Sequence, residues 1–348
     1  MKLFPPGVGP ALVAALLFGG AAPVAKLLLR ETSPWLLAAL LYLGSGLGLA
    51  ALRQLRRGPR VRLARGEWPW LAAAVLAGGV AGPVLLMLGL ARLPASQASL
   101  LLNAEAVLTA LLAWLVFKEN VDRSVAAGMA CIVAGGMVLA WPEAREAQGA
   151  LLPMLLVVAA CLAWAVDNNL TRKVSLADAS WLAMVKGLAA GSVNLAIALT
   201  LGAQWPGPAV VLAAGVLGLA SYGVSLVLFV LALRQLGTAR TGAYFSVAPF
   251  FGAVLAVGLL GEPVSWQLGA AATLMALGVW LHLRERHEHA HAHEQMTHEH
   301  EHVHGDGHHD HAHVPPVAPG TRHSHPHLHP SLVHTHPHYP DAHHRHTH

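Results

Sequence analysis

The stretch that decides the fold is residues 99–141, SLLLNAEAVLTALLAWLVFKENVDRSVAAGMACIVAGGMVLAW. It holds two long apolar runs separated by a short charged turn. A second stretch with the same plan, GAYFSVAPFFGAVLAVGLLGEPVSWQLGAAATLMALGVWL, covers residues 242–281. With a constant offset of 143 residues and no gap, Glu119 falls on Glu262. Because acidic residues are scarce in this chain, that match indicates an internal repeat.

The composition excludes an ordinary soluble protein. Of 348 residues, 55% are hydrophobic and 11% are charged, and the mean hydropathy is +0.51. A soluble globular chain carries roughly 25% charged residues. Lipid is therefore the natural solvent for this chain.

Ten apolar segments lie along the chain, each near the roughly 20 residues that a helix needs to cross a hydrocarbon core. They span residues 8–29, 34–52, 68–91, 94–117, 121–141, 150–170, 180–203, 208–233, 237–260 and 264–283. The predicted fold is an all-α integral membrane protein with ten transmembrane helices. A signal peptide is an alternative interpretation of the first segment, but its length and the lack of an A-x-A end favour a membrane helix.

Lysines and arginines between the segments favour one side of the membrane. With a cytoplasmic N-terminus, fifteen lie in cytoplasmic loops and three in outer loops. The fifteen are Lys2, Arg53, Arg56, Arg57, Arg60, Arg62, Arg65, Lys118, Arg123, Arg172, Lys173, Arg234, Arg240, Arg284 and Arg286; the three are Arg30, Arg92 and Arg145. This bias predicts a multi-pass inner-membrane protein with both termini in the cytoplasm. Topology also accounts for the net charge of +4, so we expect no nucleic-acid partner.

The repeat divides the membrane part into two halves, residues 1–142 and 143–283, followed by a tail over residues 284–348. An offset near 146 also aligns Trp35 with Trp181 and Lys26 with Arg172. Five helices per half is an odd number, so the second half enters the membrane with the opposite orientation. Inverted repeats of this kind are a common plan among secondary transporters.

The two quoted stretches resemble the ends of the two repeats of the EamA family, in the drug/metabolite transporter superfamily. In that family the fourth and ninth helices end in a Gly-Glu or similar pair, which Glu119 and Gly261-Glu262 match. The family's Glu-Pro pair within the fourth helix is Glu105-Ala106 here, without the proline, while Ala248-Pro249 in the ninth lacks the acid. The resemblance covers residues 8–283 and implies a ten-helix carrier of a small solute.

Ionisable and amide side chains at membrane depth are the candidates for a substrate pathway, because burying them there is costly. The candidates are Glu105, Lys26, Asn103, Asp167, Asn168, Asn169, Lys186 and Asn194. Glu105 lies near the midplane and is either a substrate or proton-coupling carboxyl or a protonated group that bonds within the bundle. Lys26 either faces the pathway or extends to the interface. Asn103 and Asn194 could also join helices.

The sixth helix has a polar end, Asp167 to Asn169, at the repeat position of Ala22 and Pro23. Corresponding helix interruptions in two halves are a pointer to a transporter site, so we expect one here. Asp167 and Lys186 are expected to pair across adjacent helices, with a structural or a substrate-binding role. For Glu119 and Glu262 we expect capping of the turns between helices.

The tail contains nearly all the histidines: every one of the 24 lies at or after His282. Such a polar tract predicts disorder. Its H-x-H runs are good ligands for Zn, Ni, Co or Cu. The predicted ligands are His287, His289, His291, His293, His298, His300, His302, His304, His308, His309, His311 and His313. A pH-responsive tail and low-complexity drift stay open as alternatives.

We therefore expect a secondary-active transporter of a small organic solute, with a metal-binding regulatory or buffering tail. No cofactor is required, and the partners are the solute, the lipid bilayer, divalent metal ions at the tail and a second copy in a homodimer. The sequence has no P-loop and no HExxH motif, so an enzyme is not expected. The alternatives are a Zn, Ni or Co transporter, disfavoured because the bundle has no histidine before His282, and a non-transporting membrane metal sensor or scaffold.

Overall fold

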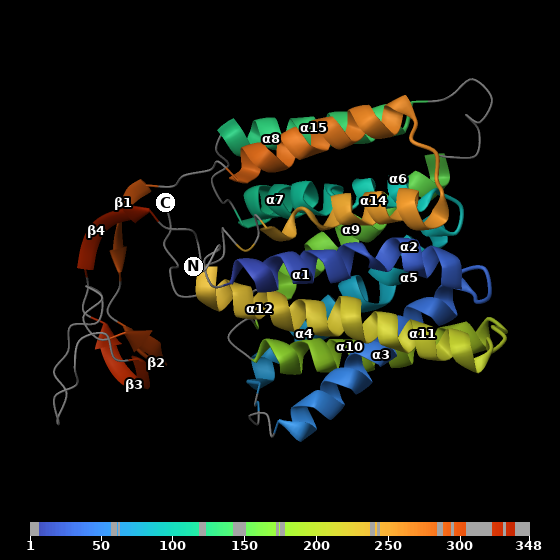
Figure 1. The fold of residues 1–348 in the computed structure, drawn as a ribbon. Helices are drawn as coiled ribbons and strands as arrows, with labels where there is room; N and C mark the ends of the chain where they lie inside the picture. The colour runs from blue at the N-terminus through green and yellow to red at the C-terminus, as the bar shows by residue number, and fades with distance from the viewer. Residues whose placement is uncertain are drawn as a thin grey trace, which may run out of the picture. The chain divides into compact units, whose positions relative to one another are not determined.

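The computed structural model describes residues 7–56, 61, 63–117, 123–141, 151–171, 174, 178–236, 241, 244–283, 288–293, 296–303, 322–329 and 332–337. The chain forms two compact units, Met1–Glu285 and Arg286–His348. The first unit is all helical where it is described, and the second contains short strands (Figure 1).

The membrane unit is the part of the chain from Met1 to Glu285, and helices make up most of the described residues in its first half. In chain order they are α1 Val8–Gly19, α2 Ala21–Leu28, α3 Pro34–Leu55, η1 Arg65–Glu67, α4 Trp68–Ala74, η2 Val75–Ala81, α5 Gly82–Leu90, α6 Ala95–Leu101, α7 Ala104–Phe117 and α8 Arg123–Leu139. The second half contains α9 Leu151–Thr171, α10 Ala179–Thr200, α11 Pro208–Gly218, η4 Leu219–Val224, α12 Ser225–Leu236, α14 Ala248–Leu260 and α15 Trp266–Leu283.

Seven helical stretches in the described residues are long and apolar enough to cross a membrane. They are Val8–Leu28, Pro34–Leu55, Arg65–Leu90, Ala95–Val116, Leu151–Thr171, Ala179–Thr200 and Pro208–Phe229. The other three predicted segments correspond to shorter apolar helices, Ala126–Leu139, Ala248–Leu260 and Trp266–Leu281. Each of the ten predicted segments thus contains helix among its described residues, and seven reach spanning length.

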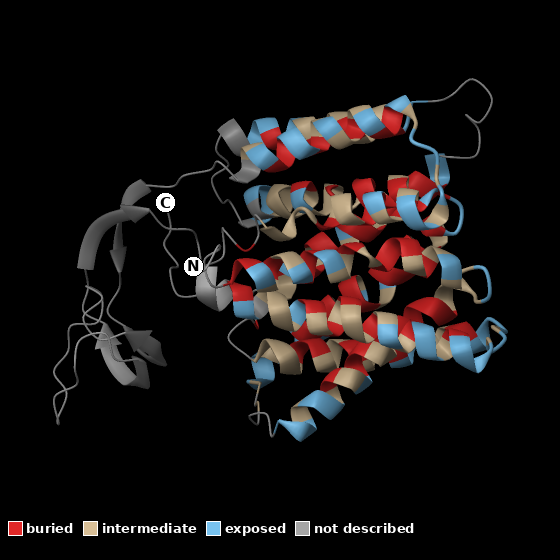
Figure 2. Cartoon of the chain, viewed as in Figure 1, coloured by how far each residue is buried: buried red, intermediate tan, exposed pale blue. Residues whose placement is uncertain are grey.

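The exposed surface of this unit carries many large apolar side chains, as a surface that faces lipid does. Buried residues gather on the faces that the helices turn toward one another (Figure 2). On the outer faces large apolar side chains stay exposed: Leu115 is 68% exposed, Leu212 69% and Val254 69%. A soluble protein rarely leaves so many large apolar side chains in water.

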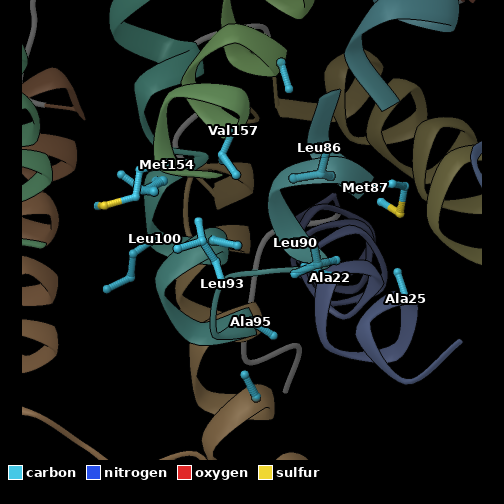
Figure 3. Close-up of a cluster of buried hydrophobic side chains, with 14 of the residues drawn as sticks. Ala22, Ala25, Leu86, Met87, Leu90, Leu93, Ala95, Leu100, Met154 and Val157 are labelled. Atoms are coloured by element: carbon cyan, nitrogen blue, oxygen red, sulfur yellow. The ribbon is translucent and has the colours of Figure 1, made fainter. Parts of the chain in front are cut away.

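The apolar core joins helices from both halves. Leu86 and Leu90 of α5 lie close to Ala22 of α2, and Met154 and Val157 extend from α9 into the same cluster (Figure 3). These side chains are nearly fully buried, which makes the contact between the two halves mainly apolar.

Helix pairing follows the internal repeat. Helix α3 packs on its counterpart α10, and α8 lies beside its counterpart α15 (Figure 1). Helix α1 of the first half contacts α12 and α14 of the second half. Its counterpart α9 in the second half contacts α5 and α7 of the first half. Each of these contacts has its partner under exchange of the halves, so the repeat seen in sequence is also a repeat of packing.

Distortions of the helices repeat as well. The π-helical segments η2 and η4 begin 144 residues apart and end 143 residues apart. The fourth apolar segment is interrupted at Leu102 and Asn103, and the ninth at Ser246 and Val247. Asp167 to Asn169 lie near the end of α9, as predicted, but α9 runs unbroken to Thr171, whereas the first segment breaks at Gly20. The amide side chains of α9 bond beside the helix and leave its backbone ladder intact.

Glycines allow the closest contacts between backbones. A Cβ on Gly44 of α3 would lie 2.3 Å from the carbonyl oxygen of Gly215 in α11, and one on Gly187 of α10 would lie 2.8 Å from the amide nitrogen of Gly46. Close approach of this kind holds membrane helices together without a hydrophobic driving force. One turn along each helix, Gly48 faces the side chain of Leu219, and Gly191 lies against the side chain and backbone of Leu43.

A polar contact joins α3 to the start of α10. The carboxylate of Asp178 accepts a hydrogen bond from the Trp181 backbone N–H at 2.8 Å, and it pairs with the guanidinium of Arg53. Burial opposes the charge of Asp178, but the hydrogen bonds from Ser180 and Trp181 and the charge of Arg53 outweigh it and lower the pKa of this carboxyl. Asp178 therefore caps α10 as an anion.

The described part of the tail consists of antiparallel strands. Strand β1 Glu288–His293 pairs with β4 Leu332–Pro337, and β2 Met296–Val303 pairs with β3 Arg322–His329. The sequence predicts disorder for the tail, and the described segments differ from that prediction by pairing as strands. The alternating H-x-H pattern has the two-residue period of a strand, and that period favours pairing.

The Gly44–Gly215 contact predicts a one-sided sensitivity to alanine. Gly44→Ala should lower the free energy of unfolding by about 1–3 kcal/mol, because its Cβ meets a backbone that cannot move freely. Gly215→Ala, at the other side of the same contact, should be neutral or slightly stabilising, since nothing lies within 4 Å of its Cβ. Thermal unfolding of both variants in detergent measures the difference; equal midpoints would contradict the packing described.

Candidate functional site

The intramembrane carboxylate Glu105 lies in the first turn of α7, directly after the interruption at Leu102 and Asn103. Its Oε1 accepts a hydrogen bond of 2.9 Å from Nδ2 of Asn168 in α9. The Glu105 side chain is half-buried and Asn168 is exposed. Among the described residues no lysine or arginine forms an ion pair with Glu105. The first half thus contributes a carboxylate, and the second an amide that holds it.

Two further amides hold the helices beside Glu105 together. Asn169 donates from Nδ2 to the Ala165 carbonyl at 2.8 Å and contacts the carbonyl of Thr109 in α7 at 3.5 Å. Asn103 donates to the Leu100 carbonyl at 3.0 Å, across the interruption. The same carbonyl also accepts from the Asn103 backbone N–H at 3.1 Å, so Asn103 closes the turn at the interruption with both its backbone and its side chain. Both side chains are buried, which favours a structural role for them.

The predicted pair of Asp167 and Lys186 is confirmed. Lys186 Nζ lies 2.6 Å from both carboxylate oxygens of Asp167, and Thr171 Oγ1 donates to Oδ1 at 2.8 Å. The Asp167 side chain is 9% exposed and that of Lys186 19%. A Cβ on Gly78 of η2 would lie 2.0 Å from Asp167 Oδ2, so this glycine makes room for the carboxylate.

The π-helical segment η2 presents carbonyls that other helices satisfy. The Gly78 carbonyl accepts from the Tyr42 hydroxyl of α3 and from Trp164 Nε1 of α9, each at 2.9 Å. The Gly79 carbonyl accepts from Asn194 Nδ2 of α10 at 3.1 Å. A π segment departs from the regular i→i+4 ladder, and such segments are frequent at functional sites. Asn194 therefore joins helices, as one of its two predicted roles required.

Aromatic rings form a continuous cluster next to this network. The ring of Tyr42 lies 5.4 Å from that of Tyr222 in η4, and Tyr222 lies 6.0 Å from Phe18 of α1. Phe18 contacts Phe245 at 5.4 Å, and Phe245 contacts Phe229 at 4.9 Å. Tyr42 joins this cluster to η2 through the hydrogen bond from its hydroxyl to the Gly78 carbonyl.

Sequence reasoning missed these aromatic residues. Tyr42, Trp164 and Tyr222 lie inside apolar segments, where aromatic residues read as packing residues. The usable signal was the Gly78-Gly79 pair in the middle of an apolar segment. Paired glycines in a helix interior are costly, so they often mark a close contact or a distortion.

Lys26, for which the sequence left a place in the pathway or an extension to the interface open, bonds to a helix end. Its ammonium donates to the carbonyls of Leu90 at 2.6 Å, Ala91 at 3.2 Å and Leu93 at 2.8 Å. These carbonyls lie at and just beyond the C-terminal end of α5, where four carbonyls lack intrahelical partners. The structure thus brings Lys26 to a helix end and not to Glu105.

Capping is confirmed for Glu262, which follows α14. Its carboxylate accepts from the backbone N–H groups of Ala95 at 2.7 Å and Ser96 at 2.9 Å, at the start of α6. Glu119 lies outside the described residues. The carboxylate of Glu262 therefore joins the ninth predicted segment to the fourth.

The predicted tail ligands fall partly in strands. His289, His291 and His293 belong to β1, and His298, His300 and His302 to β2. The other predicted ligands, His287, His304, His308, His309, His311 and His313, lie outside the described residues. In the described part of the chain, no group of three or more His, Cys, Asp or Glu residues could hold a metal ion.

Known proteins resemble most of this chain. The model of the EamA-like transporter family matches residues 5–141 and 151–284. An uncharacterized transporter of Methanothermobacter thermautotrophicus is 30% identical over 288 residues, which are 78% of this chain and 84% of that protein. A probable amino-acid metabolite efflux pump of Salmonella typhimurium is 34% identical over 82 residues, 24% of this chain and 27% of that protein.

A protein of known crystal structure shares the fold. It covers 78% of this chain and 95% of its own, with a TM-score of 0.60 and 19% sequence identity. The two family matches fall on the two halves already described, on either side of a connection outside the described residues.

The buried ion pair predicts a large effect of removing one partner. Lys186→Met should lower the free energy of unfolding by roughly 3 kcal/mol, because it leaves the Asp167 carboxylate without its cation. The double variant Asp167→Asn with Lys186→Met should recover a good part of that loss. Thermal unfolding measures both, with Arg92→Met as a control on an exposed loop. A double variant as unstable as the sum of the single variants would contradict the pairing.

Proposed function

The chain belongs to the EamA-like transporter family, and on that premise we propose that it is a secondary-active carrier of a small organic solute that works by alternating access. The observation that carries the proposal is the bond from Asn168 in the second half to Glu105 in the first. A costly intramembrane carboxylate at the contact between two repeats is where a carrier would bind its solute or coupling ion.

Repeated distortions support the same cycle. The interruptions after α6 and before α14, and the segments η2 and η4, occupy corresponding places in the two halves. Discontinuous helices at equivalent positions are typical of carriers that rock one repeat against the other. The energy would come from an ion gradient or from the solute gradient, and no catalytic chemistry is expected.

The membrane arrangement is part of the proposal. Ten spanning helices in two inverted halves, with both termini in the cytoplasm of an inner membrane, agree with the fifteen-to-three distribution of lysines and arginines. The three shorter apolar helices, which include α8 and α14, would complete the ten. A homodimer is compatible with this arrangement.

The tail would bind divalent metal ions and so buffer or regulate the carrier. Its strand register sets His298 opposite His327, and His300 opposite His325. Imidazole is a good ligand for Zn, Ni, Co and Cu ions, and this register brings histidines of two distant segments to opposite positions. Transport of the metal itself is the competing proposal; the apolar bundle, with Glu105 as its unpaired carboxylate in the described part, favours an organic solute.

Flux through purified protein in liposomes tests the main proposal. A panel of radiolabelled organic metabolites should include one whose uptake falls at least tenfold in Glu105→Ala, because the variant lacks the central carboxylate. Glu31→Ala is the matched control, since Glu31 is an exposed carboxylate between α2 and α3. Radiometal flux abolished by Glu105→Ala, with no organic solute moved, would overturn the organic carrier in favour of a metal carrier.

Removing the tail separates its role from transport. A chain ending at residue 285 should lose most of the Zn and Ni binding measured by isothermal titration calorimetry, because it lacks the 23 of the 24 histidines that lie at or after His287. Solute flux through the bundle should persist. A truncated chain that binds as much metal as the full chain would contradict a metal-binding tail.

A further inference from the structure

In the described part of the bundle, the carboxylate of Glu105 has no positively charged partner, whereas the lysines there are engaged. Asp167 is neutralised by Lys186, and Lys26 bonds to backbone carbonyls. Glu105 has a neutral amide as its partner, and no ion pair to it exists among the described residues. A solute anion would meet no unengaged lysine of the described membrane segments. A solute cation would meet a carboxylate that lacks a counter-ion.

Acceptors suited to an ammonium group lie together at Glu105. Asn168 uses its Nδ2 to hold Oε1 of the carboxylate, which leaves Oε2 and the amide carbonyl of Asn168 as neighbouring acceptors. An alkylammonium carries three N–H donors and no acceptor, like the side chain of lysine. A hydrogen bond between an ammonium and a carboxylate is about twice as strong as one between neutral groups.

The adjacent rings add a second feature that favours a cation. Tyr222 and Phe18 are half-buried. The Tyr222 ring lies 5.4 Å from that of Tyr42, whose hydroxyl bonds to Gly78 beside Asp167, the residue before Asn168. Phe18 lies on the side of α1 opposite to the exposed residues Val13 and Leu16, as the helical period requires. The faces of aromatic rings attract cations within about 6 Å, and the same rings offer apolar surface to the body of a ligand.

We propose that the solute is a small organic amine, carried as a monocation with an apolar or aromatic body. Its ammonium binds Glu105 and the Asn168 carbonyl, and its body lies against Tyr222 and Phe18. This inference rests on the proposed carrier function and names its substrate class. An amino acid would be disfavoured, because its carboxylate would lie beside Glu105 without a cationic partner.

A matched series of probes tests the charge preference. The full-length protein in nanodiscs is titrated calorimetrically with 2-phenylethylammonium, neutral 2-phenylethanol, the anion 3-phenylpropionate and zwitterionic phenylalanine. The four share a phenyl ring on a short chain and differ in charge. The amine should bind at least tenfold more tightly than the other three. Equal or tighter binding of 3-phenylpropionate or phenylalanine, or no binding of the amine, would overturn the proposal.

Variants assign the preference to named residues. Glu105→Gln should weaken binding of the amine at least tenfold, whereas Glu31→Gln should leave it unchanged. Tyr222→Leu should weaken 2-phenylethylammonium by about 3- to 30-fold and 2-cyclohexylethylammonium by less. Retained amine binding in a folded Glu105→Gln variant would overturn the assignment. If Glu105→Gln does not fold, the ranking of probes on the unmodified protein still decides.

Flux distinguishes this inference from the function on which it rests. If the amine binds as expected but does not cross proteoliposomes, the carrier function fails while the ligand class stands. If 3-phenylpropionate or phenylalanine crosses in a manner that depends on Glu105 and the amine does not, the ligand class fails while the carrier function stands.

Discussion

In a hydrocarbon environment each backbone carbonyl that leaves the helical ladder needs a donor, and the centre of this bundle depends on that requirement. The π distortion of η2 presents the carbonyls of Gly78 and Gly79, which Tyr42, Trp164 and Asn194 satisfy from three other helices. These bonds fix α3, α9 and α10 around one short segment. Helix α9 also carries Asp167 and Asn168, so the distortion of η2 also sets where these two polar side chains lie.

Small side chains make that arrangement sterically feasible. Gly78 leaves room for the carboxylate of Asp167, and Gly79 does the same for Ala190. The ion pair to Lys186 can therefore form beside the backbone of η2, inside the bundle. Backbone approach, hydrogen bonding and charge pairing are thus consequences of two adjacent glycines in one apolar segment, where any larger residue would separate the helices.

Much of the membrane part could be predicted from sequence, because the length of an apolar segment depends on local composition and the 143-residue offset follows from comparing two stretches of the sequence directly. The Asp167–Lys186 pair was also predictable, since two opposite charges in adjacent apolar helices have few other partners. The role of Lys26 was not, because it depends on where α5 ends and how its carbonyls are oriented. Nor were η2 and the ring cluster, which arise from contacts between helices distant in sequence. Tail pairing likewise depends on segments far apart in the chain.

The two halves differ in ways that bear on the energy of the proposed cycle. The first apolar segment breaks at Gly20, whereas its counterpart α9 is continuous. The positions 146 residues before Asp167 and Lys186 hold Ala21 and Leu40, so the ion pair has no equivalent in the first half. Perfectly matched halves would give inward- and outward-facing forms of equal energy. In the proposed cycle, the ion pair in one half and the helix break at Gly20 in the other would give the two forms different energies, which would bias the resting population toward one side of the membrane.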